Sequence, residues 1–368
     1  MKITDIDIRM CRHKETGMKD SEMRDGKKSD LEFLVITFHT DEGLSSSTFG
    51  FAGRGAAMAG EIANSIFKPF FIGRDPLYRE KHWHEYRTAD RWWNHAPIYS
   101  YGPFDINCWL LSSMKAEQPL YKYLGAYRDS VPIYGSSLVL KTPDAYAKEA
   151  LEYKNRGFNA YKLHPPGDYD FDLEAHKAVR KAVGDDFKLM SDPVAPYTFE
   201  QALRFGRELE KLNYYWYEEP LFDENFHNLR ELTRILDIPI VGTEVLAKHP
   251  YSVAECISTR VVDVVRADPS WSGGITATMK TAHLAESFGV SCEIHTAIYH
   301  PLELVNLHCC AAIKNCEFFE VLLPYDLFNF GLKESITIKD GNAQLPNKPG
   351  LGIDLDWDFI DNTTFKKV

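Results

Sequence analysis

Three carboxylates stand at equal intervals along the sequence, and each follows a short apolar or aromatic run. They are Asp192, Glu218 and Glu244, spaced 26 residues apart. One strand, its crossover helix and two loops take roughly 30 residues in a (β/α)8 barrel, so this interval places the acids at the C-terminal ends of successive strands. Oxygen ligands that converge from three strand ends suit a hard divalent cation such as Mg2+, which keeps water and accepts a substrate's oxygens.

A lysine and a histidine precede the three acids. Lys162 and His164 are two residues apart, and alternation along a strand sends both side chains to the same face, into the barrel mouth. Burial and the charge of a nearby cation predict a lowered pKa for Lys162. Lys162 could then act as a base or pair with an anion.

An aspartate and a histidine follow two later apolar runs. Asp268 and His295 would lie at adjacent strand ends, where a hydrogen bond between them would fix the imidazole tautomer and raise its basicity. His295 is therefore a candidate general acid or base opposite Lys162 and His164. Glu320 would close the ring from the eighth strand and could donate a hydrogen bond if protonated.

The elements that must position these residues begin at Val131, where short apolar strands start to alternate with amphipathic helices. This alternation is typical of parallel strands joined by crossover helices. Eight strands close a barrel, so we expect the α/β fold class and a modified TIM barrel, (β/α)7β, over residues 126–325. The expected strands are 132–138, 160–164, 187–191, 214–218, 238–243, 262–267, 289–294 and 318–322.

Residues 1–125 predict a smaller α+β capping domain. Two strands, Ile3–Cys11 and Leu31–Thr40, precede a Ser/Gly-rich turn and helical segments near 57–68, 76–86 and 104–123. The charged stretch 13–30 has almost no large apolar residue, so we expect a mobile loop unless a ligand orders it. Turn dipeptides in residues 326–368 predict a C-terminal tail that leaves the barrel and completes the capping domain.

Composition excludes several classes of function. The net charge of −11 and the pI near 5.7 give no basic surface for nucleic acid. No run approaches the 18 apolar residues of a membrane span. The seven cysteines are odd in number and include no Cys-x-x-Cys pair, which favours reduced thiols over disulfides or a zinc site. We therefore expect a cytoplasmic protein with no nucleic-acid or membrane partner.

Three further residues are candidates for contact with a substrate. Arg54 lies in a Gly-rich loop, Phe49–Gly55, whose glycines do not match a dinucleotide-binding motif, and we expect this loop to cover the site. Trp92 belongs to an aromatic cluster that could form core, subunit interface or ligand wall. His300 follows the seventh strand and could reach the substrate or pack.

The chemistry-bearing residues resemble the mandelate racemase subgroup of the enolase superfamily. Asp192, Glu218 within Trp216-Tyr-Glu-Glu-Pro220, and Glu244 are similar to its three magnesium ligands. Asp268, followed by Gly273-Gly-Ile-Thr276, and His295 are similar to its Asp/His dyad. The resemblance implies that Lys162 contacts the substrate carboxylate and that Glu320 donates to a forming enediolate. It also implies a homo-oligomer, from dimer to octamer.

Two departures from the family pattern shape the predicted activity. The family often has Lys-x-Lys where this chain has Lys162 and His164, and Asn two residues after the first acid, where this chain has Val194. The resemblance implies abstraction of the proton α to a carboxylate, with loss of water from a sugar acid to give a 2-keto-3-deoxy acid. The alternatives are an epimerase or racemase, a cycloisomerase, and a metal-binding scaffold without turnover.

Overall fold

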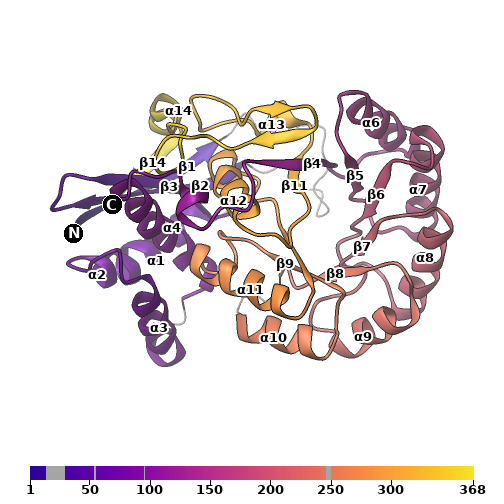
Figure 1. Ribbon diagram of the computed structural model, residues 1–368, viewed down its shortest axis with the longest axis horizontal. Coiled ribbons are helices and arrows are strands. Elements are labelled where there is room, and N and C mark those ends of the chain that lie inside the picture. Colours follow the sequence, from indigo (N-terminus) through magenta and orange to yellow (C-terminus); the bar gives the residue numbers. More distant parts are fainter. Residues whose placement is uncertain (14–29, 54, 95, 246–249) are drawn as a thin grey trace.

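The computed structural model describes residues 1–13, 30–53, 55–94, 96–245 and 250–368. Figure 1 shows two parts: a four-stranded sheet with its helices, which we call the cap, and a barrel ringed by helices. Residue 54 and most of the stretch 13–30 lie outside the described residues, so the predictions of a covering Arg54 loop and a mobile segment are not tested.

The cap sheet has the strand order β14-β1-β2-β3. Ser45–Phe51 forms β3, although the sequence analysis expected a Ser/Gly-rich turn here. The three consecutive serines give no apolar alternation, but the strand pairs antiparallel with β2 and buries Thr48 and Phe49. The strand is thus stabilised by pairing and burial that local composition does not reveal. The other strands are β1 (Ile3–His13), β2 (Leu31–Thr40) and β14 (Thr364–Lys367).

The cap helices pack on this sheet through an aromatic core. Phe67, Phe71, Tyr101 and Phe104 lie with ring centroids 5.1 to 6.0 Å apart. The helix predicted near 104–123 is two helices, α4 and α5, because it ends at Lys115 and restarts after Pro119. The elements are α1 (Ala56–Ile62), η1 (Ala63–Phe67), α2 (Lys68–Phe71), α3 (Arg79–Ala89), η2 (Asp90–Asn94), α4 (Ile98–Lys115) and α5 (Leu120–Tyr123).

The barrel confirms the predicted (β/α)7β order. Its strands pair in parallel from β4 to β10 in chain order, and β11 pairs with β4 on the other side. The strands are β4 (Ser130–Ser136), β5 (Ala160–Leu163), β6 (Lys188–Ser191), β7 (Trp216–Glu218), β8 (Ile240–Gly242), β9 (Val264–Ala267), β10 (Ser291–Ile294) and β11 (Phe319–Leu322).

One crossover helix follows each strand from β4 to β10, and several begin with a side-chain cap. Thr198 and Gln201 form a capping box at the start of α8, which satisfies two backbone N–H groups that the helix leaves free. The helices are α6 (Pro143–Asn155), α7 (Tyr169–Val183), α8 (Phe199–Lys211), α9 (Phe226–Ile235), α10 (Pro250–Ser258), α11 (Ile275–Ser287) and α12 (His300–Ala312).

The C-terminal segment runs from the barrel back to the cap sheet. β13 pairs with β4, and β14 pairs with β1. His308 of α12 accepts a hydrogen bond from the backbone N–H of Tyr121 at 3.1 Å and donates one to the carbonyl of Leu351 at 3.0 Å. The remaining elements are α13 (Tyr325–Phe328), β12 (Ile338–Lys339), β13 (Asn342–Gln344) and α14 (Trp357–Thr363).

Among the described residues, no helix is both long enough and apolar enough to cross a membrane.

Candidate active site

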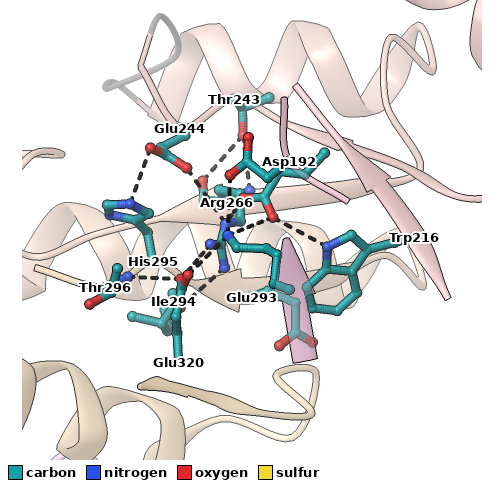
Figure 2. Close-up of polar contacts among 12 residues, drawn as sticks. Asp192, Trp216, Thr243, Glu244, Arg266, Glu293, Ile294, His295, Thr296 and Glu320 are labelled. Atoms are coloured by element: carbon teal, nitrogen blue, oxygen red, sulfur yellow. Dashed lines mark hydrogen bonds and ion pairs between the residues drawn. The ribbon is translucent and has the colours of Figure 1, made fainter. Parts of the chain in front are cut away.

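The three predicted metal ligands lie together at the C-terminal ends of β6, β7 and β8. Asp192 follows β6, Glu218 ends β7, and Glu244 comes two residues after β8. One carboxylate oxygen from each lies within 4.8 Å of the other two. Figure 2 shows Asp192 and Glu244 near the guanidinium of Arg266, with His295 beside Glu244. We call Asp192, Glu218 and Glu244 the acid cluster.

Two residues close to these acids have unusual backbone dihedral angles at the C-terminal mouth of the barrel. Val194 and Thr243 have φ angles of 58° and 75°, in the left-handed region that β-branched residues rarely adopt. The Thr243 hydroxyl exchanges hydrogen bonds with the backbone N–H and C=O of Arg266 at 3.1 and 3.2 Å. Left-handed residues of this kind collect at functional sites, where the surrounding contacts hold them.

Two cations and two carboxylates form a closed ring beneath the mouth, which we call the floor ring. Lys162 Nζ lies 2.9 Å from Glu218 Oε2 and 2.9 Å from Glu320 Oε1. On the opposite side, Arg266 Nε lies 2.6 Å from Glu218 Oε1, and Arg266 Nη2 lies 2.6 Å from Glu320 Oε2. All four side chains are at most 1% exposed, so the charges act in a poorly screened environment.

The floor ring corrects the prediction for Lys162. Burial by itself would lower the pKa of this lysine, but the charges of Glu218 and Glu320 outweigh burial and raise the pKa well above its usual value. Asp192 Oδ2 also lies 3.3 Å from its Nζ. Without a bound metal, Lys162 is therefore a charged ion-pair partner of three carboxylates and not a neutral base.

The same ring corrects the prediction that Glu320 donates a hydrogen bond. Burial would raise the pKa of Glu320, but Lys162 and Arg266 lower it well below its usual value. The carboxylate also accepts a hydrogen bond from the backbone N–H of Thr296 at 3.1 Å. Glu320 is thus an ionised acceptor of hydrogen bonds.

Arg266 was missed by the sequence analysis. It is 1% exposed and is among the largest fully buried side chains. The signal was present in the sequence, because Arg266 is a lone charge in an apolar run and stands two residues before Asp268. Side-chain alternation places these two residues on the same face of β9.

The two histidines flank the acid cluster and present the same ring nitrogen to it. His164 donates from Nδ1 to the carbonyl oxygen of Ser137 at 2.7 Å, and its Nε2 lies 3.0 Å from Asp192 Oδ2. His295 donates from Nδ1 to Asp268 Oδ2 at 3.0 Å, and its Nε2 lies 3.1 Å from Glu244 Oε1. Because each Nδ1 is bonded to an acceptor, each ring exchanges protons at Nε2.

An aromatic side chain that the sequence analysis also missed fixes the second histidine. The indole of Trp271 lies over the His295 ring with 4.5 Å between centroids. The same indole packs against Phe51 of the cap in a T-shaped arrangement, at 5.2 Å between centroids. Trp271 therefore links the cap to the ring of His295.

The acid cluster fits a hard divalent cation. Glu244 Oε2 is buried and accepts no hydrogen bond, and it lies 3.8 Å from Arg266 Nε. Burial and the charge of neighbouring Glu219 raise the pKa of Glu244 well above its usual value, so the nearby cations do not fully balance the negative charge at Glu244. Three carboxylate ligands with no nitrogen or sulfur among them suit Mg2+ better than a softer metal.

Of the three predicted substrate residues, the structure describes Trp92 and His300, and both make their contacts with residues outside the acid cluster. Arg54 lies outside the described residues. Trp92 is 63% exposed on η2, where the guanidinium of Arg91 lies 4.9 Å from its ring centroid. His300 is buried, its Nε2 accepts a hydrogen bond from the backbone N–H of Ile336 at 3.2 Å, and burial lowers its pKa to about 4. His300 therefore packs against the C-terminal segment.

Comparison with known proteins places these features in context. Residues 145–359 match the family described as Enolase C-terminal domain-like. Arabinonate dehydratase of Saccharolobus solfataricus is 31% identical over 82% of this chain and 84% of its own. 3,6-Anhydro-alpha-L-galactonate cycloisomerase of Streptomyces coelicolor is 26% identical over 91% of this chain and 92% of its own. D-glucarate dehydratase of Agrobacterium tumefaciens, solved with magnesium, is 33% identical, covers 100% of both chains and has a TM-score of 0.87.

Proposed function

The chain belongs to the enolase superfamily, in the mandelate racemase subgroup, and from this premise we propose that it dehydrates a sugar acid to a 2-keto-3-deoxy acid. The substrate class is an aldonate or aldarate, and the first step removes the proton α to its carboxylate. That proton is too weakly acidic to leave without stabilisation of the enediolate that forms.

The observation that carries this proposal is the pair of imidazole Nε2 atoms on opposite sides of the acid cluster. His164 approaches from the Asp192 side and His295 from the Glu244 side. A β-elimination needs one group to accept the α-proton and another to protonate the departing hydroxyl. Two histidines with fixed Nδ1 partners provide both groups.

We assign the base to His164 and the acid to the Asp268/His295 dyad. His164 Nε2 takes the α-proton, and the electron pair of the broken C–H bond forms the double bond of the enediolate, between the α-carbon and the carboxylate carbon. When the carboxylate re-forms, that electron pair moves into a double bond between the α- and β-carbons, and the bond from the β-carbon to its hydroxyl breaks. Protonated His295 gives its Nε2 proton to the leaving oxygen, which departs as water. The resulting enol tautomerises to the 2-keto acid.

Asp192, Glu218 and Glu244 would hold the cofactor, for which we propose Mg2+. When bound, Mg2+ supplies Lewis-acid stabilisation of the substrate carboxylate as it becomes an enediolate. Lys162 orients that carboxylate with its positive charge. Glu320, because it is ionised, supports the site by holding Lys162 and Arg266 in place.

A second candidate function is cycloisomerisation, favoured by the similarity to the Streptomyces coelicolor cycloisomerase. It shares the enediolate but closes or opens a ring instead of expelling a hydroxyl as water. Epimerisation or racemisation would return a proton to the α-carbon. A metal-binding scaffold without turnover remains the alternative from another class, and it gives no reason for two histidines with fixed tautomers around the metal ligands.

Three accompanying properties are also proposals. Arg54 contacts an anionic distal group of the substrate. The protein forms a homo-oligomer, between dimer and octamer. It works in the cytoplasm, which agrees with seven cysteines that are all free and buried.

The test is a screen of the purified protein, loaded with Mg2+, against mono- and diacid sugars. Semicarbazide absorbance reports keto-acid formation, and hits are repeated in deuterated water. We expect a keto-acid signal that EDTA abolishes and added Mg2+ restores. Deuterium at the α-carbon without keto acid would instead support epimerisation or cycloisomerisation. Neither keto acid nor α-proton exchange with any acid would support the scaffold.

A further inference from the structure

The floor ring replaces one apolar layer of the barrel interior. Its members Lys162, Glu218, Arg266 and Glu320 come from β5, β7, β9 and β11, four alternate strands. Alternate strands contribute the four side chains of one layer in such barrels, and these are usually branched and apolar. The residues two positions earlier in the sequence pack together as an apolar layer below the ring. They are Ala160, Trp216 and Val264 at the starts of three of these strands and Phe318 just before β11.

The floor ring is electrically neutral, so the net charge at the barrel mouth depends on two other acids. It contains two cations and two carboxylates, and each carboxylate uses one oxygen for Lys162 and the other for Arg266. The ring is therefore neutral as a whole. Asp192 and Glu244 stand above it, at 3.3 Å from Lys162 and 3.8 Å from Arg266 respectively. Because Glu218 and Glu320 already balance the charges of these two cations, the two negative charges of Asp192 and Glu244 match one divalent cation.

Arg266 is the ring member that joins both sides of the site. Its Nε contacts Glu218 at 2.6 Å and lies 3.8 Å from Glu244 Oε2, while its Nη2 contacts Glu320. Nη1 donates to the carbonyl of Ile294 at 3.3 Å, next to His295. A guanidinium stays charged when buried and holds two carboxylates through a rigid fork, which an ammonium cannot do.

We propose that Arg266 is a positioning residue whose fixed positive charge weakens metal binding and stabilises the enediolate. The second part rests on the proposed function, because the substrate carboxylate gains a negative charge only when the α-proton leaves. A cation held beneath the acid cluster attracts that growing charge and needs no reorganisation to do so. The same cation repels a divalent metal bound by Glu218 and Glu244.

The test separates the two effects in R266Q. Calorimetric titration of the metal-free protein with MgCl2 should show binding at least about 10-fold tighter than in the wild type, because a repelling charge is gone. Exchange of the substrate α-proton in deuterated water should fall about 100-fold in kcat, with KM changed by less than about threefold. A merely structural role for Arg266 would weaken metal binding and turnover together.

Two further variants keep the result interpretable. R266Q/E320Q removes one charge of each sign, so its Mg2+ affinity should return to within about threefold of the wild type, since ring neutrality is restored. R266K keeps the charge and loses the fork, so it should retain wild-type Mg2+ affinity while kcat falls about 10-fold. Mg2+ affinity that is unchanged or weaker in R266Q, or equal in R266Q and R266K, would overturn the proposal.

The matched control is R180Q. Arg180 is also buried, but it donates to the backbone carbonyls of Leu212, Gly184, Phe187 and Asn213, away from the acid cluster. R180Q should lower the melting temperature without changing Mg2+ affinity. Because metal affinity is measured without substrate, a failure of the proposed dehydration leaves this part of the test intact.

Discussion

His295 donates its Nδ1 proton to Oδ2 of Asp268 across 3.0 Å. The other carboxylate oxygen, Oδ1, accepts hydrogen bonds from the backbone N–H and the hydroxyl of Ser270 at 2.6 and 2.5 Å. Asp268 is therefore held from both sides, and it fixes which nitrogen of His295 faces the acid cluster. The loop after β9, which contains Asp268 and Ser270, therefore sets the orientation of the His295 imidazole.

The first prediction concerns this pair. In D268N the amide can donate to Nδ1, which would leave His295 as a neutral imidazole with its one proton on Nε2. A neutral imidazole gives up that proton far less readily than the imidazolium that the Asp268 carboxylate stabilises. We expect kcat for keto-acid formation to fall by about 10² to 10⁴-fold. Exchange of the α-proton in deuterated water should persist, because His164 is untouched. Equal loss of both activities would assign His295 to the base.

The second prediction tests His164 as the base. Its Nε2 faces the acid cluster, and asparagine keeps a polar group there but cannot take up a proton. H164N should lose α-proton exchange and keto-acid formation together, each by at least about 100-fold. The metal affinity should change far less. Full exchange in H164N would overturn the assignment and leave the dyad as the only base.

The fold could be predicted because its signals are local. A strand end followed by an acid at a 26-residue interval identifies parallel strands and the acid cluster together, and Asp268 and His295 meet because adjacent parallel strands end at one edge. The pairing of β2 with β3 is harder to predict from the sequence. Residues 45–51 form a strand because they pair with β2, and the serines at the start of β3 show no alternation that would indicate a strand.

The ionisation of the floor ring could not be predicted from the sequence. Lys162 and Glu320 are 158 residues apart. The sequence predicts a lowered pKa for Lys162 from burial and a nearby cation, and the family resemblance implies that Glu320 is a hydrogen-bond donor. Their contact, and the second cation at Arg266, reverse both assignments. Burial acts on each residue separately, whereas Coulomb energy depends on partners that only the closed barrel brings together.

The third prediction concerns stability without metal. K162M removes the cation that lies within 3.3 Å of Asp192, Glu218 and Glu320 and leaves the buried carboxylates of the floor ring with Arg266 as their one remaining cation. The free energy of unfolding in urea should fall by about 3 to 5 kcal/mol in the metal-free protein, and saturating Mg2+ should restore part of the loss.

Lys188 provides the control for that measurement. Its side chain is 39% exposed and pairs with Glu317, which is 41% exposed. K188M should change the free energy of unfolding by less than about 1 kcal/mol. If K162M and K188M cost the same, the floor ring contributes nothing to stability.

The fourth prediction is a pH dependence at the contact between cap and barrel. Asp105 of α4 accepts hydrogen bonds from the backbone N–H and the hydroxyl of Thr276 at 2.8 and 2.7 Å, and burial raises its pKa from 3.8 to about 6. Between pH 3.8 and about 6, Asp105 therefore keeps its proton in the folded protein, whereas the same carboxyl group has lost its proton in the unfolded chain. This contribution to stability is present below about pH 4 and is lost as the pH rises through about 6.

D105N removes this titration. Relative to D105N, the wild type should therefore lose about 3 kcal/mol of unfolding free energy between pH 4 and pH 7. Urea unfolding at each pH measures it, with D186N, at an exposed position before β6, as the control variant. A constant difference for D105N would mean that Asp105 titrates alike in both states.

The last prediction concerns the glycine that lets the cap approach the barrel. Gly274 has φ 95° and ψ −178°, a region open almost only to glycine, and a Cβ there would lie 2.3 Å from Asp105 Oδ2. G274A must therefore strain the backbone and displace Asp105 from Thr276, costing about 3 kcal/mol or more in unfolding free energy. Gly289 also has a positive φ, 70°, but a Cβ there meets nothing within 4 Å, so G289A should cost only about 1 kcal/mol. Equal costs in urea unfolding would mean that Asp105 moves aside freely and that its contact with Thr276 does not hold the cap in place.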